Sequence, residues 1–457
     1  MMNSETLVRD IVDAYAHAGL THDTIKQRDF FLSFLTICFI NHVQKGYYSE
    51  QVELLFNIVD TDDLKSVLEA DFINKSHASL FNEVVNEALA LPDLNPLYNM
   101  TDKLSFLLES EVLGNFDAHE LTVVYDHVLQ RLQLMNAEDR LSKNFTYQDP
   151  PYDFSELISL LAAQTGAHIA YDPLAFTGES SVSYALYNNG ASITTESVSQ
   201  THKYIKHKLL IAGVKKINTM HSYALSPYAN VEEESFDVAY TLLQPTKTSG
   251  VRDHEKLKGF SKEFLDGRVN SKTIFDKYRE HGFIQHILWS LKSTGIGFVI
   301  LGKGPLHRQF ELAARKLLID ANYVDAVIQL PSKLKAFISV PLYILVVRKN
   351  RASNEKIKFI DASGFCELDG KWNKLTGLNE LADMYHSGKA ETEILSLVSP
   401  ADIDQNTCQL TVSAYVASAA QAVEKVDVRS IRSELTHQQK LTDYYLAKLK
   451  SKSKQPI

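Results

Sequence analysis

The spacing of apolar residues changes near residue 167, and this change constrains the fold more than any other feature of the chain. Upstream, apolar residues recur at helical intervals, most strongly over residues 30–38. Downstream, short apolar runs alternate with stretches of helical length. Because strands that alternate with helices build a sheet covered on both faces, the sequence predicts an α-helical domain followed by a doubly wound α/β domain.

Short apolar segments in the second region are predicted as strands, at 168–171, 191–195, 218–221, 236–243, 297–301, 324–330 and 342–347. Helices are predicted between them, at 201–212, 283–291 and 309–320. The last two predicted strands are only about ten residues apart, too few for the helical crossover that parallel strands need. We therefore expect this last pair to be antiparallel.

Domain boundaries follow from composition and from proline. An α-helical N-terminal domain is predicted over residues 1–148, and the segment 144–151 is predicted as a linker because it ends in a Pro-Pro pair. The α/β domain is assigned to residues 149–350 and a mixed extension to 351–420. Residues 421–457 read as an amphipathic helix and a tail, which we expect to dock on a partner or on the chain itself.

Composition limits the function classes. The formal net charge is -9, whereas a chain that grips a nucleic-acid duplex alone usually shows a basic face, so a partner is expected to supply much of any DNA contact. The three cysteines are far apart and no metal-ligand spacing occurs, which indicates a reducing, cytoplasmic compartment and no metal site. Neither a secretory signal nor an apolar run of membrane-spanning length is present, so no membrane partner is expected.

Residues 172–178 read Asp-Pro-Leu-Ala-Phe-Thr-Gly, between a predicted strand and a predicted helix. This segment is similar to the Asp-Pro-x-x-Gly-x-Gly loop that opens S-adenosylmethionine-binding domains. Glycine sits in such loops so that the backbone can approach the ligand closely. Asp172, Pro173 and Gly178 are kept, but Phe176 replaces the first glycine, and its benzyl group would fill the space that glycine leaves.

Further motifs follow in order along the chain, at 291–295, 324–331, 340–341, 359–363 and 410–416. Together they resemble the modification subunit of type I restriction–modification systems, an N6-adenine DNA methyltransferase family. The resemblance covers nearly the whole chain. It implies a helical N-terminal domain, a Rossmann-like methyltransferase sheet and a C-terminal helical tail.

The same resemblance assigns roles to two further sites. Glu196 stands where the family has the acidic residue that binds the ribose hydroxyls of the cofactor, and a carboxylate suits two vicinal hydroxyls because it accepts both hydrogen bonds. The family's catalytic motif, Phe-Asp-x-x-x-x-Asn-Pro-Pro-Phe, is matched at its start by Phe236 and by Asp237, which we expect to be structural. Leu242 then replaces the asparagine, or Gln244 and Pro245 align there if two residues are inserted.

The replacement removes the chemistry of that motif. In the family, the asparagine amide and a backbone carbonyl accept hydrogen bonds from the exocyclic amine of a flipped adenine. Leu242 and Leu243 can accept none through their side chains, and Gln244 carries its amide one methylene further out, where a displacement of about 1 Å already costs rate. We therefore expect no catalytic residue in the degenerate segment Leu242, Leu243, Gln244 and Pro245, and no bound cofactor unless the S-adenosylmethionine site still functions.

Two basic segments allow alternative interpretations. Lys303 and Arg308 follow a predicted strand end, where α/β sheets bind ligands, so they are candidates for DNA-backbone contacts. A plain surface loop explains them equally well. The basic run that contains Tyr204, Lys206, His207 and Lys208, and then Lys215 and Lys216, is interpreted as a solvated helix face.

The leading hypothesis is a catalytically inactive methyltransferase-fold subunit of a DNA-binding restriction–modification or anti-phage defence complex. It would act as a structural, DNA-clamping partner of an active methyltransferase, a specificity subunit or an effector. One alternative is an active N6-adenine DNA methyltransferase with divergent motifs. Another is a sensor that uses the old pocket for a different small ligand, although Phe176 and Leu242 are both expected to point into that pocket and fill it.

Overall fold

The computed structural model describes residues 3–18, 25–46, 57, 59–70, 93–108, 110–114, 116–135, 152–163, 168–197, 202–225, 230–243, 280–334, 339–388 and 392–416. The predicted linker at 144–151 and the predicted C-terminal helix and tail at 421–457 lie outside these residues. Within the described part, no helix combines the length and apolar character that a membrane span needs.

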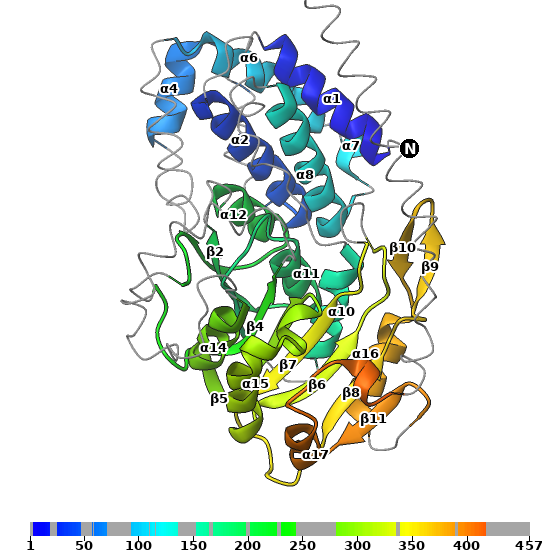
Figure 1. Cartoon of the computed structure of the whole chain (residues 1–457). Helices are drawn as coiled ribbons and strands as arrows, with labels where there is room; N and C mark the ends of the chain where they lie inside the picture. The colour runs from blue at the N-terminus through cyan, green and yellow to red at the C-terminus, as the bar shows by residue number, and fades with distance from the viewer. Residues whose placement is uncertain are drawn as a thin grey trace, which may run out of the picture.

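The N-terminal region is helical wherever it is described, as predicted, and its helices pack together above the sheet in Figure 1. They are α1 (Ser4–His17), α2 (Ile25–Val43), α4 (Thr61–Ala70), α6 (Asn95–Lys103), η2 (Ser105–Leu108), α7 (Ser110–Leu113) and α8 (Ala118–Met135). Helix α2 lies at the centre, because its residues from 28 to 40 are all buried. A helix that is buried on nearly all sides needs neighbours all round, and α6, α8 and, from the second region, α12 (His202–Ile211) supply them.

The second region is built on a nine-stranded sheet with the order β3-β2-β1-β4-β5-β7-β6-β8-β11. Its strands are β1 (Ile169–Asp172), β2 (Ser192–Ser197), β3 (Lys216–His221), β4 (Phe236–Leu242), β5 (Leu291–Leu301), β6 (Val324–Gln329), β7 (Tyr343–Arg348), β8 (Ile357–Asp361) and β11 (Leu395–Val398). Strand β7 runs antiparallel to β5 and β6, and β11 runs antiparallel to β8. The prediction of an antiparallel pair at β6 and β7 is therefore confirmed.

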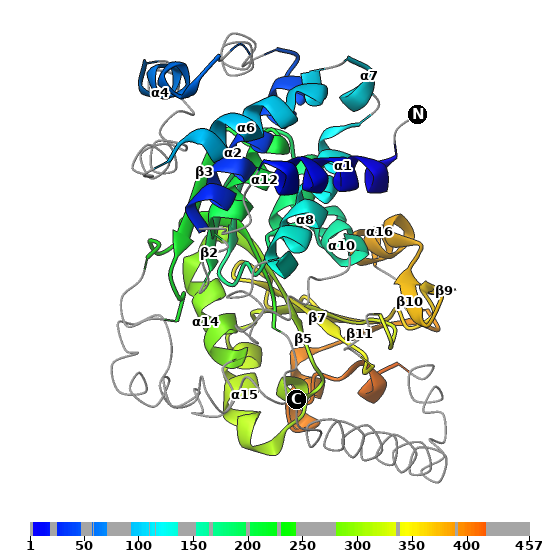
Figure 2. The same ribbon diagram turned by 90° about the horizontal axis from the view of Figure 1, so that it is seen from above.

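Helices cover both faces of the sheet, which makes the fold doubly wound as predicted (Figure 2). On one face α10 (Tyr152–Ala163), α11 (Glu179–Tyr187) and α16 (Leu378–Ser387) pack in one apolar cluster with alternate strand residues. On the other face α14 (Glu280–Ser290) and α15 (Leu312–Asp320) pack in a second cluster. The central strands β1, β4, β5, β6 and β7 thus send alternate side chains into two separate cores.

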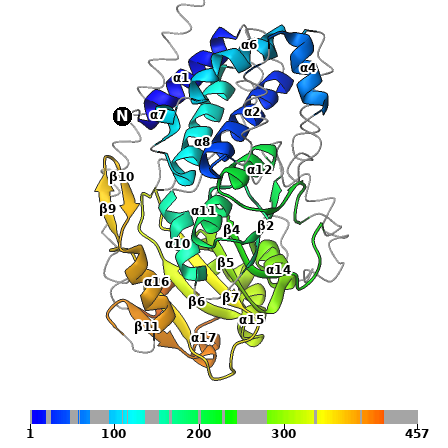
Figure 3. The same cartoon turned by 180° about the vertical axis from the view of Figure 1, so that it is seen from behind.

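The mixed extension after residue 350 completes the sheet edge. It contributes β8 and β11, the β9 (Cys366–Asp369)–β10 (Trp372–Leu375) hairpin and the short helix α17 (Pro400–Gln405). Figure 3 shows the hairpin standing out from the sheet beside α16. The Asn373 side chain ties the hairpin to the loop after β6 by donating to the backbone oxygen of Ser332 at 2.8 Å.

Helix α12 (His202–Ile211) corrects one expectation. The basic run from Tyr204 to Lys216 is predicted as a solvated face. Lys206 is partly exposed and Lys215 and Lys216, beyond the helix, are exposed, but Tyr204, His207 and Lys208 are buried. The reason is tertiary, because α2 and α8 of the N-terminal region cover this face of α12. Residues Tyr204, Leu210 and Ile211 belong to the N-terminal core, whereas Ile205 and Leu209 belong to the core of the sheet.

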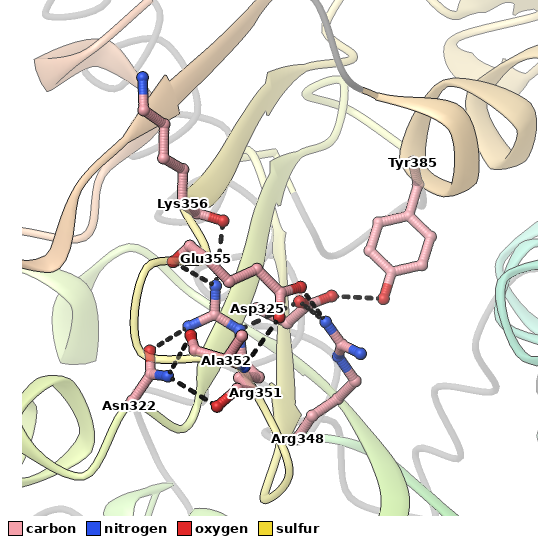
Figure 4. A network of polar contacts seen from close by, with 8 residues as sticks. All are labelled: Asn322, Asp325, Arg348, Arg351, Ala352, Glu355, Lys356 and Tyr385. Atoms are coloured by element: carbon pink, nitrogen blue, oxygen red, sulfur yellow. Dashed lines mark hydrogen bonds and ion pairs between the residues drawn. The ribbon is translucent and has the colours of Figure 1, made fainter.

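A buried polar network joins β6, β7 and α16 at the amino end of β6 (Figure 4). Asp325 accepts hydrogen bonds from Arg348 at 2.6 Å, from Arg351 at 3.2 Å and from the Tyr385 hydroxyl at 2.6 Å. The Arg351 side chain is fully buried, and it also donates to the Asn322 side chain at 2.6 Å. Burial alone would raise the pKa of Asp325, but Arg348 and its other partners hold that pKa below its usual value.

Candidate cofactor and catalytic site

The candidate site lies where the strand order reverses. Strand β1 pairs with β2 on one side and with β4 on the other, and in open α/β sheets ligands bind at the carboxyl ends of the strands beside such a switch point. Asp172 ends β1, Glu196 lies near the end of β2, and Leu242 ends β4. The fold therefore brings these sequence-predicted residues to one edge of the sheet.

Asp172 holds the start of the loop. It is buried, and its Oδ1 accepts the backbone N–H of Leu174 at 3.1 Å, which turns the chain away from the strand. Burial is the main cause that raises the pKa of Asp172 to about 7; the nearby carboxylate of Glu179 adds to this rise, and the hydrogen bond from Leu174 opposes it. Pro173 beside it is also buried.

Gly178 has a conformation and a neighbour that require glycine. Its φ is +86°, in the left-handed region that L side chains rarely adopt. A Cβ at this position would also lie 2.8 Å from Cγ2 of Ile205 in α12. Since Gly178 begins α11, the loop and the helix that follows are pressed directly against α12.

The Glu196 carboxylate is fully buried and accepts hydrogen bonds from side chains of the protein itself. The Tyr171 hydroxyl donates to Oε1 at 2.5 Å, the Ser222 hydroxyl donates to Oε2 at 2.6 Å, and the Asn230 amide donates to Oε2 at 3.0 Å. Tyr171 also contacts Nε2 of His286 at 2.9 Å. Each carboxylate oxygen therefore holds a hydroxyl group, which is the pattern that the two hydroxyls of a ribose would require.

Sequence reasoning missed these partners of Glu196. Tyr171 could have been found from the strand pattern. It pairs with Thr194 in the parallel register, so strand alternation puts Tyr171 and Glu196 on the same face of the sheet. Ser222 directly follows β3 and could have been placed at the same edge. Nothing in the sequence pointed to Asn230.

Phe176 and Leu242 do not point into one common pocket, and that expectation is wrong. Phe176 is partly buried against the cluster that contains Tyr171 and Leu225, on the α14 side of the sheet. Leu242 is buried in the other cluster, on the α10 side. The physical reason is strand alternation, since Leu242 shares its face with Val238 rather than with its neighbour in sequence, Leu243.

The end of β4 carries aliphatic side chains where the family motif has an amide. Leu242 and Leu243 are both buried, and the backbone N–H of Leu243 donates to the carbonyl of Ile300 at 2.7 Å, which extends the pairing with β5. Gln244 and Pro245, the other residues of the predicted degenerate motif, lie outside the described residues.

Asp237 lies at the opposite edge of the sheet and has a structural role there. Its carboxylate accepts the backbone N–H of Ile169 at 3.0 Å and the ammonium of Lys292 at 2.7 Å. Burial would raise the pKa of Asp237, but the hydrogen bond from Lys292 and those from the β1 backbone lower it below its usual value.

The two candidates for DNA contact differ in their surroundings. Lys303 is exposed at the loop after β5. Arg308 is partly buried, and its guanidinium contacts Glu311 at 2.5 Å and Glu280 at 3.3 Å. The charge of Arg308 is therefore already balanced within the protein. Among the described residues, no group of three or more side chains is arranged to hold a metal ion.

The residues present are a poor fit to S-adenosylmethionine. Phe176 occupies the place of the glycine that would lie against the ligand, and the acceptor positions of Glu196 are engaged by Tyr171, Ser222 and Asn230. The sheet order and the strand–loop–helix unit at its switch point nonetheless define a methyltransferase-type α/β protein.

Comparison with known proteins agrees with this class. The model of the N-6 DNA methylase family matches residues 192–424, slightly more than half of the chain and beginning after the 172–178 loop. The chain therefore belongs to the N-6 DNA methylase family. The resemblance to modification subunits of type I systems is confirmed.

The most similar proteins include methylase subunits. The type I restriction enzyme MpnII methylase subunit of Mycoplasma pneumoniae is 35% identical over 156 residues, which covers 34% of this chain and 28% of that protein. The MjaVII methylase subunit of Methanocaldococcus jannaschii is 25% identical over 212 residues, which covers 42% of this chain and 35% of that protein. The matches thus span 28% to 35% of the length of these relatives.

A solved structure of similar fold is the type I restriction–modification methyltransferase subunit of Streptococcus thermophilus. The alignment has a TM-score of 0.62 and 16% sequence identity, and it covers 91% of this chain and 99% of that one. At this identity the likeness concerns the fold, including the helical N-terminal region and the sheet.

Proposed function

We propose that this chain is a catalytically inactive, methyltransferase-fold subunit of a DNA-binding restriction–modification or anti-phage defence complex. The proposal rests on the burial of Glu196 and on the hydrogen bonds that its carboxylate already accepts. Its carboxylate is buried and already accepts the hydroxyls of Tyr171 and Ser222. To bind a ribose there, the protein would have to give up hydrogen bonds to a charged group, each worth about 1.5–3 kcal/mol.

Two further features support the loss of chemistry. Phe176 brings a bulky side chain to the loop position where close backbone approach is needed. Leu242 and Leu243 end β4 with side chains that cannot accept the hydrogen bonds of an adenine amine. Each change alone would lower the activity of a methyltransferase. Together they affect both the binding of the cofactor and the binding of the target base.

The proposed role is structural. The subunit would hold DNA together with an active methyltransferase, a specificity subunit or a defence effector, in the cytoplasm. Its net charge of -9 favours a shared rather than a solitary grip on DNA. Since Arg308 is paired with Glu311 and Glu280, we assign the DNA-backbone contact at this edge to Lys303.

The alternative is an active N6-adenine DNA methyltransferase with divergent motifs, which would use S-adenosylmethionine. It is favoured by one observation, that Asp172, Gly178 and Glu196 are kept and meet at the switch point of the sheet. In that case Gln244 would have to take the role of the missing asparagine.

Methyl transfer separates the two proposals. The purified chain, alone and with any subunits that co-purify, is incubated with adenine-containing DNA and S-adenosylmethionine carrying a labelled methyl group. We expect no more incorporation than with a matched Asp172→Ala, Glu196→Ala double variant. Incorporation that the double variant and a Gln244→Ala variant both lose would establish the active enzyme instead.

A further inference from the structure

Lys208 is a buried cation between the N-terminal helices and the candidate cofactor loop. Its side chain is 1% exposed, and its Nζ lies 2.8 Å from Oδ1 of Asp126 in α8 and 2.8 Å from Oε1 of Glu179 in the first turn of α11. A single ammonium group thus joins two carboxylates that belong to different parts of the fold.

The Glu179 end of this contact belongs to the loop. Glu179 directly follows Gly178, and its other oxygen accepts the hydroxyl of Thr177. Burial would raise the pKa of Glu179, but Lys208 lowers it on balance. Burial likewise opposes the charge of Lys208, yet Asp126 and Glu179 raise its pKa above the ordinary value. Glu179 and Lys208 therefore both remain charged at neutral pH.

Helix α12 makes a second contact with the loop one turn earlier. Ile205 packs against Gly178 so closely that a Cβ on the glycine would lie within 2.8 Å of it. The opposite face of α12 meets the N-terminal helices, where Tyr204 donates to Asp29 at 2.8 Å and Tyr125 contacts His207 at 2.7 Å. Helix α12 is thus held on one side by the N-terminal region and presses on the loop with the other.

We infer that Lys208 is a positioning residue that couples the docking of the N-terminal helices on α12 to the conformation of the loop at residues 172–179. When α8 presents Asp126, Lys208 is held over the loop and fixes Glu179 and Thr177. When α8 withdraws, Lys208 loses one of its two carboxylates and the loop loses its anchor. Because such coupling is a free energy shared by two sites, it acts equally in both directions.

The energetic basis is the cost of an incomplete buried ion network. Removing one partner from a buried pair leaves an uncompensated charge, whereas an exposed pair contributes little. The Lys208 side chain is only 1% exposed, whereas Asp126 and Glu179 are 21% and 15% exposed, so the loss of either carboxylate leaves the ammonium with little access to water. The loop is therefore sensitive to Asp126, although this residue lies 46 positions before the loop begins at Asp172 (172 − 126).

Amide hydrogen exchange on the full-length chain tests the coupling from both sides. In Asp126→Asn, we expect the amides of residues 174–182 to exchange at least about fivefold faster, the lower end of typical coupling strengths. In Glu179→Gln, reciprocity requires faster exchange in α8, although the substitution lies in another part of the fold. A general loss of stability would raise exchange throughout the sheet as well, so β6 and β7 serve as the internal reference.

Asp29→Asn is the matched control, because Asp29 bonds the α12 residues Tyr204 and Lys203 whereas Lys208 keeps both of its carboxylates in this variant. It should change exchange in α2 and α12 but leave residues 174–182 at the wild-type rate. Unchanged loop exchange in Asp126→Asn together with unchanged α8 exchange in Glu179→Gln would overturn the inference. Because hydrogen exchange is measured without a ligand, this result would not bear on the proposed loss of methyltransferase activity. Conversely, methyl transfer by the chain would contradict the proposed function but not the coupling through Lys208.

Discussion

At the scale of single residues, the ionisation of Asp172 should be visible in the stability of the fold. Its pKa is raised to about 7 by burial, whereas an unfolded aspartate titrates near about 3.9. A group with a raised pKa contributes most to stability below its unfolded pKa, and this contribution is lost as the pH rises through the folded pKa. Between about pH 4 and pH 7 ionisation of Asp172 therefore lowers the free energy of unfolding.

The Asp172→Asn variant should remove this penalty, because an amide oxygen still accepts the Leu174 N–H but carries no charge. We expect the variant to be more stable than wild type at pH 8 by about 2–4 kcal/mol and much closer to it at pH 4. Urea unfolding of both proteins at the two pH values measures the difference. A stability difference that does not change with pH would contradict the account.

Single residues were predictable where one strand or one turn determines their position. Asp172 and Glu196 were placed correctly at one sheet edge because each follows a short apolar strand. The surroundings of Arg308 were not predictable, since Glu280 lies 28 residues upstream and meets it only through the packing of α14. For the same reason Asn230 could not be recognised as a partner of Glu196.

At the scale of elements, α12 connects the two parts of the fold through buried polar groups. His207 is central, with its ring nitrogens near the Tyr125 hydroxyl and the Ser33 hydroxyl. Burial is the main cause that lowers the pKa of His207 to about 3, and the positive charges of Lys206 and Lys203 contribute to this lowering. A lowered histidine pKa gives stability that is complete above the unfolded pKa near 6.5 and is lost as the pH falls toward 3.

The predicted consequence is acid sensitivity of this helix contact. From pH 7 to pH 5, the contribution of His207 should fall by about 2 kcal/mol. A His207→Gln variant keeps a polar side chain without this titration, so its unfolding free energy should change less over the same range. Chemical unfolding at both pH values provides the comparison, and equal pH dependence in the two proteins would rule this role out.

Sequence patterns predicted most strands of the sheet well. They did not predict that α12 is buried between the N-terminal helices and the sheet. Strands β1 to β4, β6 and β7 lie close to their predicted segments, because each is a short apolar run between polar turns. Strand β5 begins at Leu291, six residues before its predicted start at residue 297, so the predicted turn at 291–295 is wrong. Helix α12 was found at nearly its predicted bounds. Its polar residues were misread because their partners in α2 and α8 lie about 80 to 175 residues away in sequence.

At the scale of the whole molecule, the network around Asp325 should be a major source of stability, because it ties β6, β7 and α16 together. Asp325→Ala would leave Arg351, which is fully buried, without its carboxylate. We expect a loss of about 3–5 kcal/mol, the usual cost of breaking a buried ion pair from one side. The urea midpoint of unfolding measures this loss.

The control for Asp325 is Lys316→Gln, because Lys316 forms ion pairs with Asp320 and Asp404 on the surface. Exposed pairs contribute little, so this variant should unfold at the wild-type urea concentration. If both variants shifted the midpoint equally, burial would not be the reason for the strength of the Asp325 network.

The domain boundary predicted between residues 148 and 149 stays a prediction. The hydrophobic cores of the N-terminal region and of the sheet show how these two parts of the fold are joined. Tyr204, Leu210 and Ile211 of α12 complete the N-terminal core, although they lie well after that boundary in sequence. Sequence composition cannot reveal such sharing, because it shows where apolar residues are and not which core they enter.

The central claim is that the cofactor site has lost its function, and calorimetric titration of the full-length chain with S-adenosylmethionine tests it most directly. The account predicts no binding by the wild type up to about 1 mM, a range in which a site of about -4 kcal/mol would be detected. The Phe176→Gly variant, titrated in parallel, reports whether the benzyl group is the main obstacle. Micromolar binding by the wild-type chain would contradict the account.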